Sequence, residues 1–264
     1  MSCGPDAGRL DPGERATILG MALLVVAAAW WALLDSHGAG HPVGQTPGFA
    51  VLATNALALS QPSFWSLAPM WGLMAVAMML PPTLPWIWFY AAASRNPEDG
   101  GLRWASVLLF VLGYLLIWLA FGVAATAAQL SLSRAGFLTP DQGGRLAARM
   151  ASALVLLAAG AYQLSPVKDA CLRHCRTPLS YFLTAWRDGP SGGFSMGFRH
   201  GLYCFGCCWA LMAVSFSVGV MNLLWMAVLT LALTIEKATT WGRRLTPALG
   251  VLLILWGFAS ALLG

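Results

Sequence analysis

Soft metal ligands concentrate in one part of this 264-residue sequence. Five of the six cysteines and two of the four histidines lie between Cys171 and Cys208. The first group contains Cys171, His174 and Cys175, whose i, i+3, i+4 spacing places them on one face of a helical turn. Two thiolates and an imidazole on one face could bind a transition metal such as copper, zinc or iron.

A second group follows after a glycine-rich connector. His200, Cys204, Cys207 and Cys208 are spaced i, i+4, i+7 and i+8, so they form one stripe along a helix. Cysteines in an apolar helix are often small buried hydrophobes, and that alternative stays open for the three thiols by themselves. Two further features favour a metal site. The same stripe carries an imidazole, which is costly to place at membrane depth, and the first Cys/His group lies nearby.

Methionines form a third set of soft ligands. Met70, Met74 and Met78 share a helix face, and Met79 lies beside them. Such a row is usually ordinary packing, because methionine fills irregular gaps well. If its helix lies beside the cysteine stripe, however, thioethers and thiolates would form a ladder of ligands that selects Cu(I) over hard cations. Zinc would use only the cysteines and histidines.

Other polar residues have simpler explanations. His37 and His41 could collect a metal in the first loop, but solvated loop histidines are the simpler interpretation. Asp169 and Glu236 could complete a site or orient a ligand imidazole. We expect both carboxylates to form ion pairs instead. The basic residues near them are Arg173, Arg176 and Lys237.

The composition requires a membrane environment for these groups. Hydrophobic residues make up 58% of the chain and charged residues only 9%, which is too little polar surface for a soluble globule. Several apolar runs exceed the roughly 18 residues that cross a bilayer core. Continuous runs favour an all-α, polytopic transmembrane bundle over a β-barrel. The net charge of +5 lies in loops, so we expect no nucleic-acid partner.

The apolar runs predict about seven spans in one transmembrane domain, residues 16–264, after a polar tail at 1–15. The spans are 16–34, 65–93 with a proline break at 81–85, 104–130, 146–164, 198–218, one ending near 235–237, and 247–263. A Cys/His-bearing connector occupies 166–197. Gly193, Gly197 and Gly201 would let a neighbouring helix approach the fifth span, although Gly193 by itself is more simply a loop glycine.

Basic residues orient this bundle. With the N-terminus inside and the C-terminus outside, 12 of the 15 Lys and Arg residues face the cytoplasm, as the positive-inside rule requires. Cys171 and Cys175 then lie on the cytoplasmic side, and the fifth span enters from that side. The cytoplasm is reducing, so these thiols stay available for metal instead of pairing as disulfides.

These motifs lie in four stretches of the sequence, residues 71–81, 162–175, 197–209 and 221–237. They resemble the predicted metal-binding integral membrane proteins of a bacterial and archaeal domain-of-unknown-function group. The resemblance covers most of residues 65–240 and includes every Cys and His position of the two groups. It implies a membrane location and metal binding, and it implies no particular reaction.

We therefore expect a multi-pass protein of the bacterial inner membrane, embedded in the lipid bilayer. It would bind a soft transition metal, with copper favoured over zinc or iron, for handling, transfer or delivery to a protein partner. A membrane metalloenzyme with redox chemistry at the same residues is the alternative. A haem carrier is third, with His174 and His200 as axial ligands, although Cys-x-x-His-Cys is not the order of covalent haem attachment. Without a P-loop, ATP-driven pumping by this chain is not expected.

Overall fold

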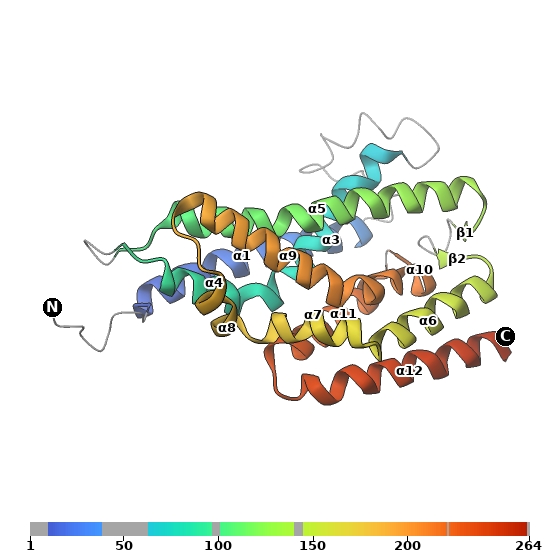
Figure 1. Ribbon diagram of the computed structural model, residues 1–264. Helices are drawn as coiled ribbons and strands as arrows, with labels where there is room; N and C mark the ends of the chain where they lie inside the picture. Colours follow the sequence, from blue (N-terminus) through green and yellow to red (C-terminus); the bar gives the residue numbers. More distant parts are fainter. Residues whose placement is uncertain (1–9, 39–62, 97–100, 140–144, 221, 263–264) are drawn as a thin grey trace.

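A computed structural model describes residues 10–38, 63–96, 101–139, 145–220 and 222–262 (Figure 1). The helices are α1 (Pro12–Gly38), α3 (Phe64–Met79), the 3-10 helix η2 (Pro81–Thr83), α4 (Leu84–Ala93), α5 (Trp104–Arg134), α6 (Arg149–Gln163), α7 (Pro166–Arg176), α8 (Pro178–Ala185), α9 (Gly189–Ala213), α10 (Ser215–Val218), α11 (Leu223–Ala238) and α12 (Gly242–Leu262). The only strands in these ranges are β1 (Leu138–Thr139) and β2 (Arg145–Leu146), which pair antiparallel. The predicted helical architecture is confirmed.

Several helices are long and apolar enough to cross a membrane. Four meet this description in the described ranges: α1 over Pro12–Asp35, α5, the continuous segment of α9 and α10, and α12. Two bent pairs, α3 with α4 and α6 with α7, raise the number to six if each pair is one span. Helix α11 corresponds to the predicted sixth span, but its 16 residues are fewer than the roughly 20 that span a bilayer. The total of seven stays a prediction.

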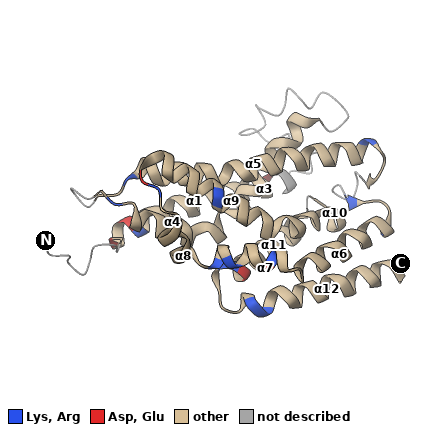
Figure 2. Ribbon diagram, in the orientation of Figure 1, with Lys and Arg blue, Asp and Glu red and all other residues tan. Residues whose placement is uncertain are grey.

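Successive long helices along the chain run in alternating directions, so α5 and α9, which pack together, run parallel. In Figure 1 the start of α1, the end of α4, the start of α5 and helix α8 lie at one end of the bundle, and the C-terminus lies at the other. Figure 2 shows basic residues toward the first end and along α7, with few at the opposite end. This charge asymmetry supports the predicted N-in, C-out orientation, which itself stays a prediction.

Prolines interrupt the second helical segment where the sequence predicted a break. Helix α3 ends at Met79, η2 follows at Pro81, and α4 leaves at a 44° bend. Pro81 and Pro82 lack the backbone N–H that would continue the α-helical hydrogen bonds. The break places Trp86 of α4 beside the connector helices, as the contacts of its side chain show below.

The predicted connector 166–197 is largely helical. Ser165 caps α7 by accepting a hydrogen bond from the Lys168 backbone N–H, and Pro166 occupies the first turn, where no N–H is needed. Helix α9 then begins at Gly189, nine residues before the predicted start at 198. The Cys171–Cys175 segment is helical, as its spacing predicted.

Glycines bring α9 into close contact with α5. A Cβ atom at Gly193 would lie 2.5 Å from the carbonyl oxygen of Ser106, and one at Gly197 would collide with the carbonyl oxygen of Phe110. At Gly201 the nearest atom would be Cγ1 of Ile117, at 2.9 Å. The predicted close approach is confirmed at all three positions. Gly193 lies in the helix, so its interpretation as a loop glycine is wrong.

Candidate metal centre

Helices α7 and α9 pack together and bring cysteines from both predicted groups into one place. The Cys175 Sγ lies 3.8 Å from the Cys207 Sγ, which lies 3.3 Å from the Cys208 Sγ. The Cys207 Sγ also donates a hydrogen bond of 3.1 Å to the backbone carbonyl oxygen of Cys204, whose side chain belongs to the same buried core. Each of the four side chains is at most 4% exposed. We call Cys175, Cys204, Cys207 and Cys208 the thiol cluster.

A buried lysine contacts this cluster. The Lys237 Nζ, from α11, donates a hydrogen bond of 2.9 Å to the Cys204 Sγ. An ammonium group at this distance, in surroundings of low dielectric constant, stabilises negative charge on the sulfur. The Tyr114 hydroxyl lies 3.1 Å from the same sulfur and donates to the Met79 carbonyl oxygen at 2.9 Å. Cys204 of α9 is thus connected to α11, α5 and the end of α3.

Cys171 and His174 of the first group lie outside the thiol cluster. Cys171 is half-buried, and its Sγ would lie 2.7 Å from a Cβ atom at Gly206. His174 is exposed, stacks on Tyr203 with ring centroids 4.2 Å apart, and has its Nδ1 3.3 Å from the Ala170 carbonyl oxygen. Successive helical residues turn by about 100°, so His174 and Cys175 face different directions although both are near Cys171. Of the first group, only Cys175 belongs to the thiol cluster.

His200 is buried one helical turn before Cys204. Its ring stacks on Trp86 with centroids 3.8 Å apart, and Tyr114 lies on it at 5.3 Å. Within the described residues its Nδ1 has no hydrogen-bond partner. A buried, unpaired imidazole nitrogen is unusual because buried polar atoms normally have partners. Nδ1 is therefore available as a donor atom to a soft metal.

The methionine row is buried. Met74, Met78 and Met79 are inaccessible to solvent and Met70 is 6% exposed. All four belong to the same hydrophobic core as the buried cysteines of the cluster. Burial agrees both with packing and with a ligand role, so the thioether ladder stays a prediction.

Both acidic residues form ion pairs, as expected, but one takes a partner that was not predicted. Asp169 pairs with Arg173 at 2.8 Å on the surface. Glu236 pairs with Lys168 at 2.9 Å, and both side chains are at most 1% exposed. Gln163 completes this buried group by donating to Glu236 at 3.2 Å and accepting from Lys168.

The two basic residues expected near Glu236 have other roles. The Arg176 Nε donates to the backbone carbonyl oxygen of Glu236 at 2.7 Å, and Lys237 contacts Cys204. The Arg176 hydrogen bond and the Lys168 pair hold α7 against the C-terminal end of α11. The helix that carries Cys175 is thereby fixed beside the helix end that carries Lys237.

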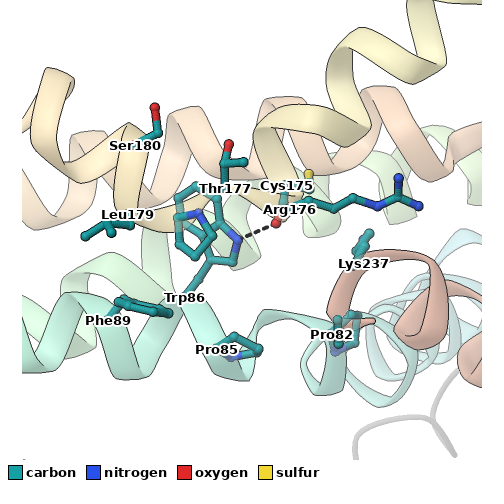
Figure 3. Close-up of a pocket in the computed structure, with 12 residues that line it drawn as sticks. Pro82, Pro85, Trp86, Phe89, Cys175, Arg176, Thr177, Leu179, Ser180 and Lys237 are labelled. Carbon is teal, nitrogen blue, oxygen red and sulfur yellow. Dashed lines mark hydrogen bonds between the residues drawn. The ribbon is translucent and has the colours of Figure 1, made fainter. Parts of the chain in front are cut away.

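A cavity of about 540 Å³ opens beside the cluster. Figure 3 shows one wall made by Pro82, Pro85, Trp86 and Phe89, with residues of the α7–α8 segment opposite and Lys237 at one side. The Trp86 Nε1 donates to the Cys175 carbonyl oxygen at 2.8 Å, the dashed line in the figure. The cavity therefore reaches Cys175 and Lys237 from outside the helix bundle.

Sequence reasoning missed three residues of this site. Lys237 gave a usable signal, because an ionisable residue at the end of an apolar segment is costly and often functional. Tyr114 and Trp86 gave none, since aromatic residues are common in apolar helices. His41 and Cys3 lie outside the described residues, as does the side chain of His37.

The donor set suits a soft monovalent metal. Thiols, an unpaired imidazole nitrogen and nearby thioethers are the ligands that Cu(I) prefers. Among the described residues, no group of three or more His, Cys, Asp or Glu side chains is arranged to hold a metal ion.

Comparison with known proteins identifies the family. The family model for PpoB2, described as a copper chaperone, matches residues 68–260, which include all of α5 to α11 and the whole thiol cluster. No curated protein and no solved structure matches the chain significantly. The match covers well over half of the sequence, so this chain belongs to the PpoB2 copper chaperone family.

Proposed function

We propose that this chain is a membrane-embedded copper chaperone that holds Cu(I) on the thiol cluster and passes it to a protein partner. Family membership supports copper handling. The single observation that carries the assignment of residues is the convergence of Cys175 from α7 with Cys204, Cys207 and Cys208 from α9. His200 and the methionine row are the further ligands of the proposal.

Charge balance favours Cu(I) in this site. Two thiolates and one Cu(I) ion carry a single negative charge, which one buried ammonium group neutralises. Lys237 supplies that group at 2.9 Å from Cys204. A tetrathiolate zinc site would carry two negative charges and leave one of them unpaired in the protein interior, where an uncompensated charge is expensive. A Cu(I) site on two of the four cysteines, with the other two protonated, therefore matches the single charge of Lys237.

An excess of thiols supports transfer over permanent storage. Four cysteine sulfurs lie close together, although Cu(I) can be held by two or three soft ligands. Copper can thus exchange from one pair of sulfurs to the next without leaving thiolate coordination. Cys175 lines the cavity, whereas Cys204 and Cys208 are fully enclosed. The direction of exchange is set by whichever partner supplies or removes copper.

The membrane location of the proposal follows from the apolar helices. Several of them are long enough to cross a bilayer, and we propose a bacterial inner membrane with the N-terminus and the α7–α8 connector on the cytoplasmic side. The cavity then opens at the cytoplasmic boundary. A cytosolic copper source or acceptor could reach Cys175 there without crossing lipid.

Copper binding by cysteine variants tests this proposal. The purified protein in detergent is titrated with Cu(I) against a chromophoric Cu(I) chelator, under reducing conditions without oxygen. The wild type is expected to retain copper, and Cys207→Ser and Cys208→Ser are each expected to bind at least ten-fold more weakly. Cys171→Ser is the matched control, because it removes a thiol of the same motif that lies outside the cluster, and it should bind like the wild type.

Two outcomes would overturn the proposal. Wild-type protein that loses all copper to the chelator would not be a copper carrier. Copper affinity that depends on Cys171 and not on Cys207 or Cys208 would place the site elsewhere. An absorption spectrum with haem bands in the isolated protein would favour the haem alternative instead.

A further inference from the structure

We infer that the cavity beside Cys175 admits copper as a small anionic Cu(I)–thiol complex, and that Arg176 with Lys237 selects for that negative charge. The inference rests on the proposed function, since it requires Cu(I) to bind at the thiol cluster. It adds the chemical class of the copper donor and the residues that recognise it.

The charge around the cavity is positive. Its lining contains two basic residues, Arg176 and Lys237, and no acidic residue. The nearest buried carboxylate, Glu236, is already neutralised by Lys168 at 2.9 Å. Asp169 lies on the surface and pairs with Arg173. The net charge beside the cavity is therefore positive, which attracts an anion and repels hydrated copper ions.

Arg176 keeps a positive charge that no carboxylate of the described residues balances. Its Nε donates to the Glu236 backbone carbonyl oxygen, and none of the ion pairs among the described residues includes its guanidinium group. A guanidinium group stays protonated at physiological pH, so this charge persists at the edge of the cavity. A small thiol that carries carboxylates would be attracted to it.

The size and composition of the cavity suit a small molecule. About 540 Å³ lies within the usual range of small-molecule sites and is too small for a folded protein domain. Trp86, Phe89 and the two prolines offer an apolar wall. This surface suits the aliphatic parts of a peptide-sized thiol.

The transfer step is a thiol exchange. The Cys175 sulfur bonds to the copper of a [Cu(SR)₂]⁻ donor, one Cu–SR bond breaks, and the proton of Cys175 leaves with the departing thiol as RSH. Cys207, whose sulfur is 3.8 Å from that of Cys175, displaces the second donor thiol in the same way. Copper stays Cu(I) throughout, so no oxidant or reductant is needed.

Loading kinetics test the inference. The full-length protein in lipid nanodiscs is mixed with Cu(I) presented either as its glutathione complex, which is anionic, or as its acetonitrile complex, which is cationic. Arg176→Gln is expected to slow loading from the glutathione complex about five-fold at low ionic strength and to leave loading from the acetonitrile complex unchanged. Added salt should remove the difference. Arg173→Gln is the control, because Arg173 is exposed on the same helix and does not line the cavity.

A second variant keeps the test informative even if the Arg176→Gln protein does not fold. Ser180 is exposed at the cavity and makes no contact with the cluster, so Ser180→Trp should obstruct the bulky glutathione complex while Ser180→Ala should not. The equilibrium Cu(I) affinity of both variants should equal that of the wild type. Wild-type loading rates from glutathione in both Arg176→Gln and Ser180→Trp would overturn the inference. Loading from a copper-loaded protein donor alone, with neither small complex active, would overturn it as well.

The failure of the two proposals can be told apart. If the wild type binds no Cu(I) at equilibrium, the proposed function itself is wrong. If it binds Cu(I) normally but loads without regard to donor charge or cavity volume, only the inference about the donor is wrong.

Discussion

The side chains of Lys237 and Cys204 meet inside the helix bundle, with Nζ 2.9 Å from Sγ, although they come from different helices and are separated by 32 intervening residues. Both are nearly inaccessible to solvent, at 8% and 1% exposure. A buried positive charge is expensive unless it has a counter-charge. This contact therefore links the stability of the bundle end to the charge state of the copper cluster.

Removing the Lys237 charge should weaken copper binding. A hydrogen bond to a charged group contributes about 1.5–3 kcal/mol, so Lys237→Met is expected to lower Cu(I) affinity by about ten- to a hundred-fold. Lys237→Arg keeps the charge and should retain most of the affinity. Chelator competition measures both variants, with Arg173→Met as the control for loss of a surface charge. Equal affinities in Lys237→Met and the wild type would show that the ammonium group has no role in binding.

The buried Lys168–Glu236 pair should dominate the stability of the α7–α11 contact. Glu236→Gln leaves the Lys168 charge without a partner, which typically costs about 3–5 kcal/mol. Asp169→Asn breaks the exposed pair with Arg173 and should cost about 0–1 kcal/mol. Thermal unfolding in detergent is expected to show a large drop in Tm for the first variant only. A similar Tm for both would mean that the buried pair is not formed as described.

The α5–α9 interface should not tolerate a side chain at Gly197. A methyl group there would collide with the Phe110 carbonyl oxygen, and overpacking of this kind costs about 1–3 kcal/mol. Gly20, in the interior of α1, has no atom within 4 Å of an added Cβ, so Gly20→Ala should be neutral or slightly stabilising. Tm values of the two alanine variants, compared with the wild type, check the prediction. A Gly197→Ala protein as stable as Gly20→Ala would contradict it.

Leucine substitutions separate the two interpretations of the methionine row. Met and Leu have similar volumes, so Met74→Leu with Met78→Leu should change stability by less than about 1.5 kcal/mol for each site. If the thioethers are ligands, the double variant should retain less copper after dialysis while its Tm stays close to that of the wild type. Leu73, a partly buried neighbour on α3, provides the control Leu73→Met. If the double variant retains as much copper as the wild type, the methionines contribute to packing and are not copper ligands.

Much of this protein could be predicted from its sequence, because the relevant information is local. Long apolar runs with few charges determine membrane-length helices, since backbone polar groups must be satisfied within each segment. Helical spacing determines that His200, Cys204 and Cys208 share a stripe and that the methionines share a face. Pro81 and Pro82 determine the break after α3 because they cannot donate hydrogen bonds. The asymmetry of basic loops likewise needs no structure.

Only the tertiary structure decided which of these faces meet. Periodicity tells which residues share a face of α7, but not which face α9 covers, and so it could not separate buried Cys175 from exposed His174. Neighbours in sequence were also assigned wrongly: Glu236 and Lys237 point about 100° apart on their helix, so one reaches Lys168 and the other Cys204. The thiol cluster exists because segments about thirty residues apart pack together. That packing is a property of the whole bundle, and no local pattern contains it.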